Sequence, residues 1–428
     1  METGSDRAPD IISNLPLNVI EGILMCLPLR DAVRTSILSR KWRYRWTTIP
    51  QLVFDDTCVP VTSSSLAVTK TKFVSFVDRA LLLHRGPIQK FKLSISYLQS
   101  CPDIDQWILF LSWRNVKEIS LELEEKEWYK VPSCLFSCQY LTHLELFRCE
   151  VHPPPTFKGF SNLKSLSFQQ SYFENGVVES ILSSCPILES FTLTYFDTLS
   201  MNICAPNLKY LRLEGEFKDI CLENTPLLET ICIALYMTEE IADHLEATTT
   251  CNLIKALGNV PALERLVAES YFVKYLSVKS VPSKLALKYE HLKKLELYQV
   301  GFEDVNEISV AICLLVCSPN LEELLFSASS DNEACIGPDM DYWDKQHPID
   351  CSFKRLQIVN MTDMSGVPDE MEFTKFLLAK SPVLKTMSIK SSTYLTVEGA
   401  WDMLIELLGF PRASPQARII YIQDNTMT

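Results

Sequence analysis

The side chains that most often carry catalytic or metal-binding chemistry are numerous in this chain but lack the spacing that such chemistry needs. The sequence holds 15 cysteines and 6 histidines, yet it contains no Cys-x-x-Cys, and the closest pairs, Cys134/Cys138 and Cys313/Cys317, are four residues apart. Structural zinc sites usually combine two close ligand pairs. We therefore expect no metal site and no cofactor, and we interpret most cysteines as small buried apolar residues in a reducing compartment.

Motifs that mark nucleotide-binding or hydrolytic enzymes are also missing. The sequence has no Gly-x-x-x-x-Gly-Lys-Ser/Thr, no Gly-x-Ser-x-Gly and no His-Glu-x-x-His segment. Glycine is scarce, at 12 of 428 residues, which disfavours a glycine-rich phosphate loop. We therefore expect a protein that is not an enzyme and has no catalytic residues.

Two acidic segments are candidate recognition surfaces. The first precedes the aromatic pair Trp128 and Tyr129 and holds Glu118, Glu122, Glu124, Glu125 and Glu127. It could attract a basic partner, or it could be a solvated rim of the fold. The second, residues 327–350, combines acidic residues with Tyr342 and Trp343. It could be an insertion that reaches over a binding surface, or it could be disordered.

Length, charge and hydropathy exclude several classes of protein. A chain of 428 residues that is 47% hydrophobic can hold two or three domains with a packed core. A net charge of −13 argues against a nucleic acid partner, and the lack of an 18-residue apolar run argues against a membrane span. The N-terminus lacks the pattern of a secretory signal, so we expect a cytoplasmic and/or nuclear protein.

A short template, apolar-x-x-apolar-x-apolar, recurs along most of the chain and predicts the fold. Its copies are Ile88/Phe91/Leu93, Val116/Ile119/Leu121, Leu141/Leu144/Leu146, Leu163/Leu166/Phe168, Leu188/Phe191/Leu193, Leu208/Leu211/Leu213, Leu228/Ile231/Ile233, Leu263/Leu266, Leu292/Leu295/Leu297, Leu321/Leu324/Phe326, Phe353/Leu356/Ile358 and Leu384/Met387/Ile389. Each copy predicts a short strand with alternate side chains pointing inward. The steps between copies, about 20 to 35 residues, are typical of leucine-rich repeats with insertions.

Proline marks the entry to many of these strands. It precedes the first apolar position by two residues in six copies, at Pro186, Pro206, Pro226, Pro261, Pro319 and Pro382. Upstream of it the apolar spacing is helical, as in residues 177–182, and proline cannot continue a helix. The predicted unit is therefore helix, proline, strand. Such units bury their apolar faces only by stacking, and the stack leaves an extended concave sheet for recognition.

The first fifty residues follow a different pattern and are more basic than the rest, with seven Lys/Arg against five Asp/Glu. Asn14-Leu15-Pro16 predicts a helix start, and an apolar stripe with helical spacing follows at Leu17, Ile20, Ile23, Leu24 and Leu27. Pro28 ends this helix, and residues 31–38 and 39–46 are predicted as second and third helices. Three such short helices cannot bury much surface alone, so their exposed apolar faces need a partner.

This segment resembles a plant F-box over residues 9–55, on the Leu15-Pro16 opening and the Leu38-Ser39-x-x-Trp42-x-x-x-Trp46 signature. The resemblance implies docking onto a Skp-type adaptor, which links to a cullin scaffold and a ubiquitin-charged enzyme. The adaptor-contacting positions that it implies are Leu15, Pro16, Ile20, Ile23, Leu24, Leu27, Val33, Leu38, Ser39 and Trp42. Each of them could instead belong to the small core of the module itself.

The tail also resembles a known region. Tyr342-Trp343, residues 353–358 and residues 372–389 are similar to the FBD region that follows the repeats in many plant F-box proteins. The sequence departs from that pattern at residues 348–352, which read Pro-Ile-Asp-Cys-Ser in place of Val-Pro-x-Cys-Leu. The pattern predicts one more strand, helix and strand, which could simply cap the repeat stack.

These observations predict an α/β protein with a three-helix F-box at 9–55, a connecting helix or linker at 56–85, irregular leucine-rich repeats at 86–345 and an FBD-like cap at 346–420. The expected function is that of a substrate-recognition subunit of a Skp–cullin–F-box ubiquitin ligase. The alternative is a scaffold or inhibitor whose repeats bind a protein partner without any link to degradation. We expect protein partners only, with neither nucleic acid nor membrane among them.

Overall fold

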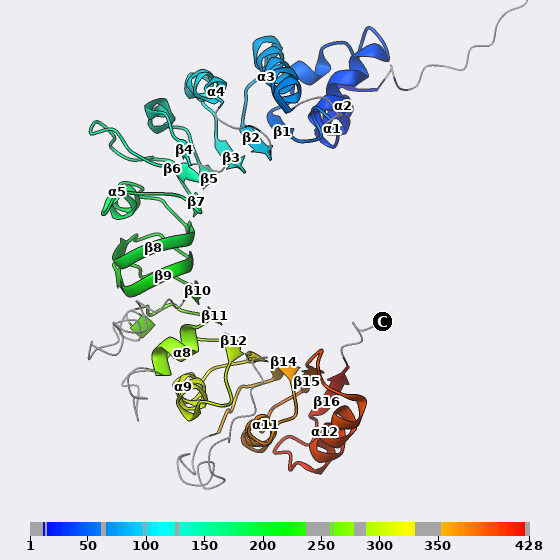
Figure 1. The fold of residues 1–428 in the computed structure, drawn as a ribbon, viewed down its shortest axis with the longest axis vertical. Helices are drawn as coiled ribbons and strands as arrows, with labels where there is room; N and C mark the ends of the chain where they lie inside the picture. Colours follow the sequence, from blue (N-terminus) through cyan, green and yellow to red (C-terminus); the bar gives the residue numbers. More distant parts are fainter. Residues whose placement is uncertain are drawn as a thin grey trace, which may run out of the picture. The chain divides into compact units, whose positions relative to one another are not determined.

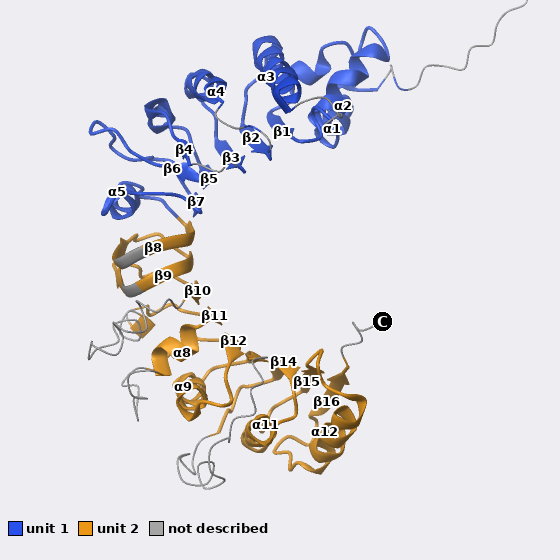
Figure 2. Ribbon diagram, in the orientation of Figure 1, with its two compact units in different colours: residues 1–188 blue, residues 189–428 orange. Residues whose placement is uncertain are grey.

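A computed structural model describes residues 12, 15–60, 66–96, 98, 101–124, 128–236, 257–258, 260–277, 288–329 and 352–423. Contacts divide the chain into two compact units, residues 1–188 and 189–428 (Figure 2). Each unit combines parallel strands with helices on one face of the sheet (Figure 1), which confirms the predicted mixed α/β fold class. No helix in the described ranges is long and apolar enough to span a membrane.

Unit 1 begins with a module of short helices, α1 (Leu17–Met25), α2 (Leu29–Arg34), and the 3-10 helices η2 (Thr35–Ile37) and η3 (Arg45–Thr48). Pro16 is the residue that caps α1, since its carbonyl accepts the backbone N–H of Val19 and of Ile20, each at 3.1 Å. Asn14, at the start of the predicted cap, lies outside the described residues.

The third predicted helix of this module, residues 39–46, is wrong in extent. Residues 40–44 form turns, and Tyr44 adopts a left-handed φ of 65° that no α-helix contains. Only the four residues of η3 are helical, as a 3-10 turn. The apolar and aromatic residues here have helical spacing, but the chain uses them to turn into the first strand of the sheet.

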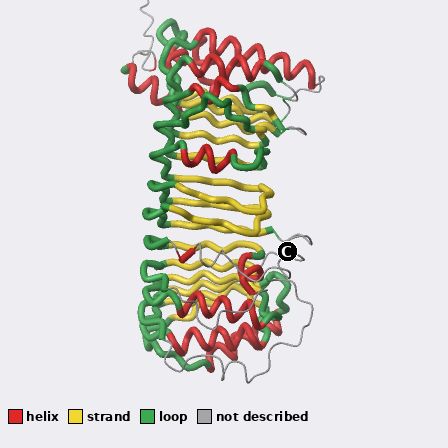
Figure 3. Tube along the Cα trace, turned by 90° about the vertical axis from the view of Figure 1, so that its left-hand side faces the viewer, coloured by secondary structure: helices red, strands yellow, loops and turns green. Residues whose placement is uncertain are grey.

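Five parallel strands form the described part of the unit 1 sheet, in the order β1-β2-β3-β5-β7. They are β1 (Gln51–Asp55), β2 (Lys90–Ile95), β3 (Glu118–Leu123), β5 (His143–Phe147) and β7 (Ser165–Gln169). Figure 3 shows strands of the chain running side by side. The helical segments α3 (Leu66–Leu83), α4 (Asp103–Ser112), η4 (Ser133–Ser137) and α5 (Val177–Ser183) cover one face (Figure 1). A separate short pair is β4 (Tyr129–Lys130) and β6 (Cys149–Glu150). The uncovered sheet face is called the open face below.

β1 was not among the predicted repeat strands, although Ile49, Leu52 and Phe54 fit the same template. It pairs with β2 in register, Leu52 with Phe91 and Phe54 with Leu93, and all four of these side chains are fully buried. The repeat sheet therefore begins directly after η3, inside the segment that resembles the F-box. The predicted strands at β2, β3, β5 and β7 are confirmed in position.

The described part of the unit 2 sheet runs in chain order from β8 to β16, again with parallel pairing. Its strands are β8 (Ser190–Cys204), β9 (Tyr210–Glu223), β10 (Thr230–Leu235), β11 (Arg265–Ser270), β12 (Lys294–Val300), β13 (Glu323–Ala328), β14 (Ile358–Met364), β15 (Thr386–Ser391) and β16 (Arg418–Ile422). Its helices are α8 (Phe272–Ser277), α9 (Val305–Val316), α11 (Pro368–Lys380) and α12 (Val397–Gly409).

The prediction of a helix before Pro206 and before Pro226 is wrong. These prolines follow β8 and β9, which pair in parallel almost to their ends, with a register shift between Thr194 and Phe196. Tyr195, with φ of 56°, forms the bend at that shift. Beyond the bend Met201 and Ile203 of β8 and Ile220 and Leu222 of β9 are buried, with exposed residues between them. Strands therefore cover the core here, where helices do so in other repeats.

The strand predicted on Phe353, Leu356 and Ile358 lies three residues further along. Val359 and Met361 pair with Leu324 and Phe326 of β13 and are buried, whereas Ile358 is 39% exposed. Two overlapping segments satisfy the same apolar template, one starting at Phe353 and one at Leu356. Pairing with β13 places the second in the strand. Phe353 instead takes the buried turn position before the repeat, where its carbonyl accepts the N–H of Leu356 at 3.3 Å.

The C-terminal region contains more than the predicted strand, helix and strand. β14, α11 and β15 supply those three elements, and α12 and β16 follow them as a second helix and strand. β15 is confirmed at its predicted place, with Met387 and Ile389 buried. β16 pairs with β15 and is only partly buried.

Candidate functional site

The ten predicted adaptor-contacting residues divide into buried and accessible ones. Ile20, Leu24 and Trp42 form the core of the helical module and are at most 2% exposed. The accessible or half-accessible ones are Leu15, Pro16, Ile23, Leu27, Val33, Leu38 and Ser39. In this chain the first group therefore shapes the module, and only the second group offers surface to a partner.

Ser39 is the one polar member of the predicted set. Its Oγ is buried and has no hydrogen-bond partner among the described residues. Trp42 Nε1 donates to the carbonyl of Ile12 at 3.2 Å, which ties the segment before α1 to the turn after η2.

Several exposed apolar residues of the module escaped the sequence prediction. Ile37, adjacent to Leu38, is 87% exposed, and Leu38 is 61% exposed. Leu17, Val19 and Met25 are further large apolar side chains exposed on α1. A helical projection places Val19 and Met25 off the buried line formed by Ile20 and Leu24, whereas Leu17 projects close to that line and only the structure shows that it is exposed. A small module with this much exposed apolar surface has the composition of a protein-docking site.

The module is joined to the first repeat by a dense set of hydrogen bonds. The N–H groups of Arg85 and Gly86 donate to the Thr47 carbonyl at 2.8 and 3.2 Å, and Gln89 N–H donates to the Pro50 carbonyl at 2.8 Å. The buried ring of His84 contacts the Ile49 carbonyl through Nε2 at 2.8 Å, and burial lowers its pKa. The helical module therefore also closes the N-terminal end of the unit 1 sheet.

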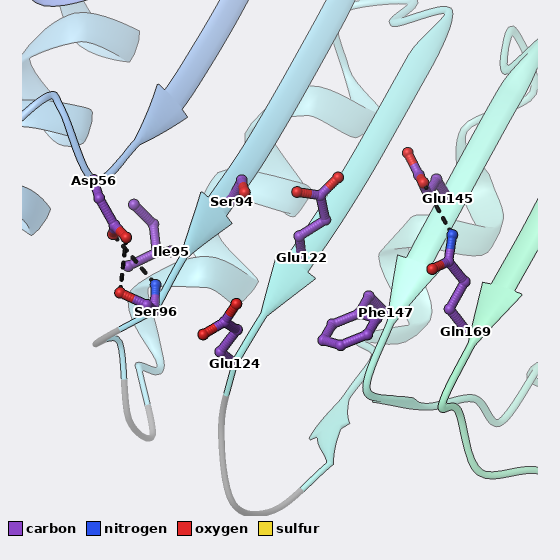
Figure 4. A pocket seen from close by; sticks show the side chains of 9 residues that line it. All are labelled: Asp56, Ser94, Ile95, Ser96, Glu122, Glu124, Glu145, Phe147 and Gln169. Carbon is purple, nitrogen blue, oxygen red and sulfur yellow. Dashed lines mark hydrogen bonds between the residues drawn. The ribbon is translucent and has the colours of Figure 1, made fainter. Parts of the chain in front are cut away.

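The open face of unit 1 carries a hollow of about 270 Å³ at the carboxyl ends of its strands (Figure 4). Its lining residues are Asp56, Ser94, Ile95, Ser96, Glu122, Glu124, Glu145, Phe147 and Gln169. Because the strands are parallel and in register, equivalent positions of successive repeats meet there, as Ser94, Glu122, Phe147 and Gln169 do. An aromatic ring surrounded by carboxylates is thus built by residues from five separate segments of the chain.

Most carboxylates of this hollow have partners within the chain. Glu122 receives Lys92 Nζ at 2.5 Å, and Glu145 accepts Ser120 Oγ at 2.9 Å and Gln169 Nε2 at 3.3 Å. Burial alone raises the pKa of Glu122, but hydrogen bonds from Lys92 and Ser94 and the Lys92 charge outweigh it and lower the pKa overall. Glu122 is therefore held as an anion on the sheet surface.

The acidic segment before Trp128 is dispersed by the fold. Glu118 and Glu122 lie on β3 and Glu124 at the hollow, while residues 125–127 lie outside the described ranges. Trp128 stacks on Tyr172 with ring centroids 5.4 Å apart, and its Nε1 donates to the Gln170 carbonyl at 2.8 Å. Trp128 therefore has structural contacts within the chain. Of the acidic stretch 327–350, only residues 327–329 are described.

The open face of unit 2 is crossed by ion pairs between strands. Arg212 of β9 reaches Glu269 of β11 at 3.0 Å and Glu214 of its own strand at 2.9 Å. Arg265 of β11 contacts Glu296 of β12 at 2.7 Å, and Lys294 contacts Glu323 of β13 at 3.0 Å. Alternate positions of these strands are therefore polar and are held in place by these ion pairs.

Seven of the twelve described cysteines are buried, whereas Cys26 and Cys221 are exposed. Burial raises the pKa of Cys138 to about 12 and that of Cys58 and Cys101 to about 11. A thiol with such a pKa stays protonated at neutral pH and is a poor nucleophile and metal ligand. Within the described ranges, no group of three or more His, Cys, Asp or Glu side chains is placed to hold a metal ion.

Three family models match separate parts of the chain. Residues 12–52 match the F-box domain, and residues 344–389 match the FBD. Residues 104–326, more than half of the chain, match the model described as "FBD-associated F-box protein At5g56370, LRR repeats". The module, the repeat stack and the C-terminal region each correspond to one of these models.

The chain is similar over nearly its whole length to proteins from Arabidopsis thaliana. "F-box/FBD/LRR-repeat protein At1g13570" is 50% identical over 424 residues, which cover 98% of this chain and 100% of the relative. "FBD-associated F-box protein At4g10400" is 28% identical over 422 residues, covering 95% of this chain and 98% of the relative. The chain belongs to the plant F-box/FBD/LRR-repeat protein family.

Proposed function

We propose that this F-box protein is the substrate-recognition subunit of a Skp–cullin–F-box ubiquitin ligase, acting in the cytoplasm or nucleus. The helical module at residues 15–48 docks a Skp-type adaptor, and the open faces of the repeats hold a target protein. The observation that carries the proposal is the exposed apolar surface of an F-box module whose own core is already complete.

The proposed mechanism is positioning, which needs no reactive side chain. Holding a target close to a ubiquitin-charged enzyme raises the effective concentration of the target lysines. The hydrogen bonds between residues 47–50 and 84–90 support this role, because they give the docking module a fixed attachment to the first repeat. A flexible tether would position the target less well.

The docking half of the proposal predicts that Ile37→Asp/Leu38→Asp abolishes adaptor binding. Both side chains are exposed, so the substitutions leave the module folded, while two carboxylates in an apolar interface cost several kcal/mol of desolvation. Binding of the purified adaptor to the full chain would be measured by calorimetry, with circular dichroism to confirm folding. Adaptor affinity equal to that of the wild type would refute the proposed docking surface.

Leu82→Asp is the matched control. Leu82 is 83% exposed on α3, in the same unit but outside the F-box module. It tests whether any new carboxylate on this unit weakens adaptor binding, and we expect wild-type affinity.

The alternative, a repeat scaffold without any link to degradation, makes a different prediction for the same variants. Deleting residues 1–50 cannot separate the two functions, because it removes the Thr47 and Pro50 carbonyls that hold the loop before β2. Ile37→Asp/Leu38→Asp does separate them. Cellular turnover of a bound target should slow in this variant if the protein is a ligase subunit, and should not change if it is a scaffold.

A further inference from the structure

Another hollow of unit 1, of about 620 Å³, lies where the helical module meets α3. It is lined by Arg30 of α2, by residues 58–60 after β1 and by one face of α3. The α3 residues in it are Thr71, Lys72, Ser75, Phe76 and Arg79. Three of its lining residues are cations, and none of those that the structure describes is Asp or Glu. It is called the basic hollow below.

The three cations of the basic hollow, Arg30, Lys72 and Arg79, have no ion-pair partner within the part of the chain that the structure describes. Asp78, next to Arg79 in the sequence, instead accepts the Nε1–H of Trp107 at 2.8 Å. On the open sheet faces, by contrast, cations pair with carboxylates of neighbouring strands. The chain has 53 acidic and 40 basic side chains, so three unpaired cations in one hollow are a local excess of positive charge that attracts an anion.

The spacing of the cations on α3 indicates the shape of that anion. Lys72 and Arg79 are seven residues apart, so they lie almost in line on the helix, two turns or about 10.5 Å apart along its axis. An extended peptide covers this length with about three residues. Phe76 lies between them along the helix and is half-buried, with its ring edge-to-face on Phe54 at 6.1 Å between centroids. This arrangement fits an extended segment that carries an apolar side chain between carboxylates.

The basic hollow lies mostly outside the segments that the family models match. Arg30 is within the F-box match at residues 12–52, but the other lining residues lie between its end and the start of the repeat match at residue 104. None of the ten predicted adaptor-contacting residues is among its described lining residues. Residues 61–65, which join its loop to α3, contain no Asp or Glu that could neutralise it. The basic hollow is therefore a surface distinct from the proposed adaptor-docking one.

We propose that the basic hollow binds an acidic, extended segment of a partner protein other than the adaptor, with Arg30, Lys72 and Arg79 holding its carboxylates. A guanidinium group binds a carboxylate through two parallel N–H donors, and the lysine ammonium adds a third positive charge. The proposal does not depend on the ligase assignment, because a ligase subunit and a scaffold could both use such a surface.

Labelled peptides test the proposal with the full chain. The probe is about ten residues long, so that when extended it exceeds the span from Lys72 to Arg79, and it has glutamates on both sides of a central leucine. The control peptide has glutamine in place of each glutamate. Binding is followed by fluorescence anisotropy. We expect the glutamate peptide to bind at least about tenfold more tightly than the glutamine peptide, with an affinity that falls as salt is added.

Lys72→Glu/Arg79→Glu reverses the charge of two exposed residues of α3. Glutamate is a good helix former, so the helix should remain intact, which circular dichroism checks. We expect this variant to lose at least about tenfold in affinity for the glutamate peptide. The matched control is Lys354→Glu/Arg355→Glu, which makes the same change of net charge at two exposed positions of unit 2 and should keep the wild-type affinity.

A third peptide, with lysine in place of each glutamate, tests the selection of charge. Lys72→Glu/Arg79→Glu should bind this peptide more tightly than the wild type does, because its hollow now presents carboxylates. Lys354→Glu/Arg355→Glu should show no such gain.

Three results would overturn the proposal. The wild type could fail to distinguish the glutamate peptide from the glutamine peptide. The two charge-reversal variants could behave alike, which would show an effect of net charge and not of a site. Purified adaptor could lose as much affinity for Lys72→Glu/Arg79→Glu as for Ile37→Asp/Leu38→Asp, which would make the basic hollow part of the adaptor-docking surface.

Discussion

Two helices of unit 2, α9 and α11, each have a buried glutamate in the first turn. Glu307 of α9 and Glu370 of α11 occupy the same place in the first helical turn, and both side chains are buried. Glu307 accepts the Gly301 N–H at 2.9 Å, and Glu370 accepts the N–H groups of Ser365 and Gly366, each at 2.7 Å. Burial raises the pKa of each to about 7, although the N–H donors oppose it. The same arrangement, a buried glutamate that accepts backbone N–H groups of the preceding loop, thus recurs in two repeats.

The raised pKa of Glu370 predicts that the free energy of unfolding depends on pH, and that Glu370→Gln removes this dependence. A carboxyl whose pKa is higher in the native state than in the unfolded state binds its proton more tightly when folded. Its stabilising contribution is full below about pH 4.5 and is lost as the pH rises towards 7. We therefore expect the free energy of unfolding of the wild type to fall relative to the variant across that range, by up to about 3 kcal/mol.

Urea unfolding at a series of pH values measures this difference. Glu372→Gln is the control, because Glu372 is on the same helix but pairs with Lys375 at 2.8 Å near the surface. A wild-type-minus-Glu370→Gln difference that stays constant between pH 4.5 and 7 would show that Glu370 does not titrate in this way.

At the scale of elements, the replacement of helices by long bent strands is the main irregularity of the repeat stack. Phe196 of β8 and Phe217 of β9 stack in parallel, with ring centroids 5.5 Å apart. The bend that brings Phe196 inward leaves no room beside Gly215, where a β-carbon would lie 2.3 Å from the Phe196 carbonyl oxygen. Glycine at this position is therefore part of the strand geometry.

Gly215→Ala should accordingly lower the free energy of unfolding, by about 1–3 kcal/mol, because the β8 backbone must shift. Gly22→Ala is the opposite case, since nothing lies within 4 Å of its β-carbon position in the middle of α1. Removing a helix-interior glycine should stabilise the protein by up to about 1 kcal/mol. Urea unfolding followed by circular dichroism compares the two, and a neutral Gly215→Ala would contradict the close approach.

At the scale of the whole molecule, stability comes from contacts between neighbouring repeats. In unit 2, Phe373 of α11 contacts Phe326 of β13 at 4.8 Å and Phe302, which follows β12, at 5.8 Å between ring centroids. These rings join three consecutive repeats. Because each repeat packs only on its neighbours, damage at one point should remain local.

Phe373→Ala should therefore cost about 3–5 kcal/mol and act mainly within unit 2. Hydrogen exchange measured by mass spectrometry should show protection lost in β12 to β15 and retained in β1 to β5. An equal loss of protection in both units would instead show that the chain unfolds as a single cooperative body.

The sequence by itself determined the repeated strands and the identity of the F-box, because both depend on local patterns. The apolar-x-x-apolar-x-apolar template states which side chains of a strand are buried, and eleven of the twelve predicted strands lie where the template placed them. The Leu15-Pro16 opening and the tryptophans at 42 and 46 similarly mark the module without knowledge of its contacts. The repeat fold therefore followed from spacing, and the family followed from the resemblance of these motifs to the F-box.

Where the spacing was ambiguous, only the tertiary structure determined which residues form a strand and which are buried. Phe353 and Leu356 both could start a repeat, and pairing with β13 chose Leu356. In the F-box module, Ile20 and Ile23 have equal hydrophobicity, but packing within the module leaves Ile20 1% exposed and Ile23 38% exposed. Burial is a property of what lies opposite a side chain, which no local pattern contains.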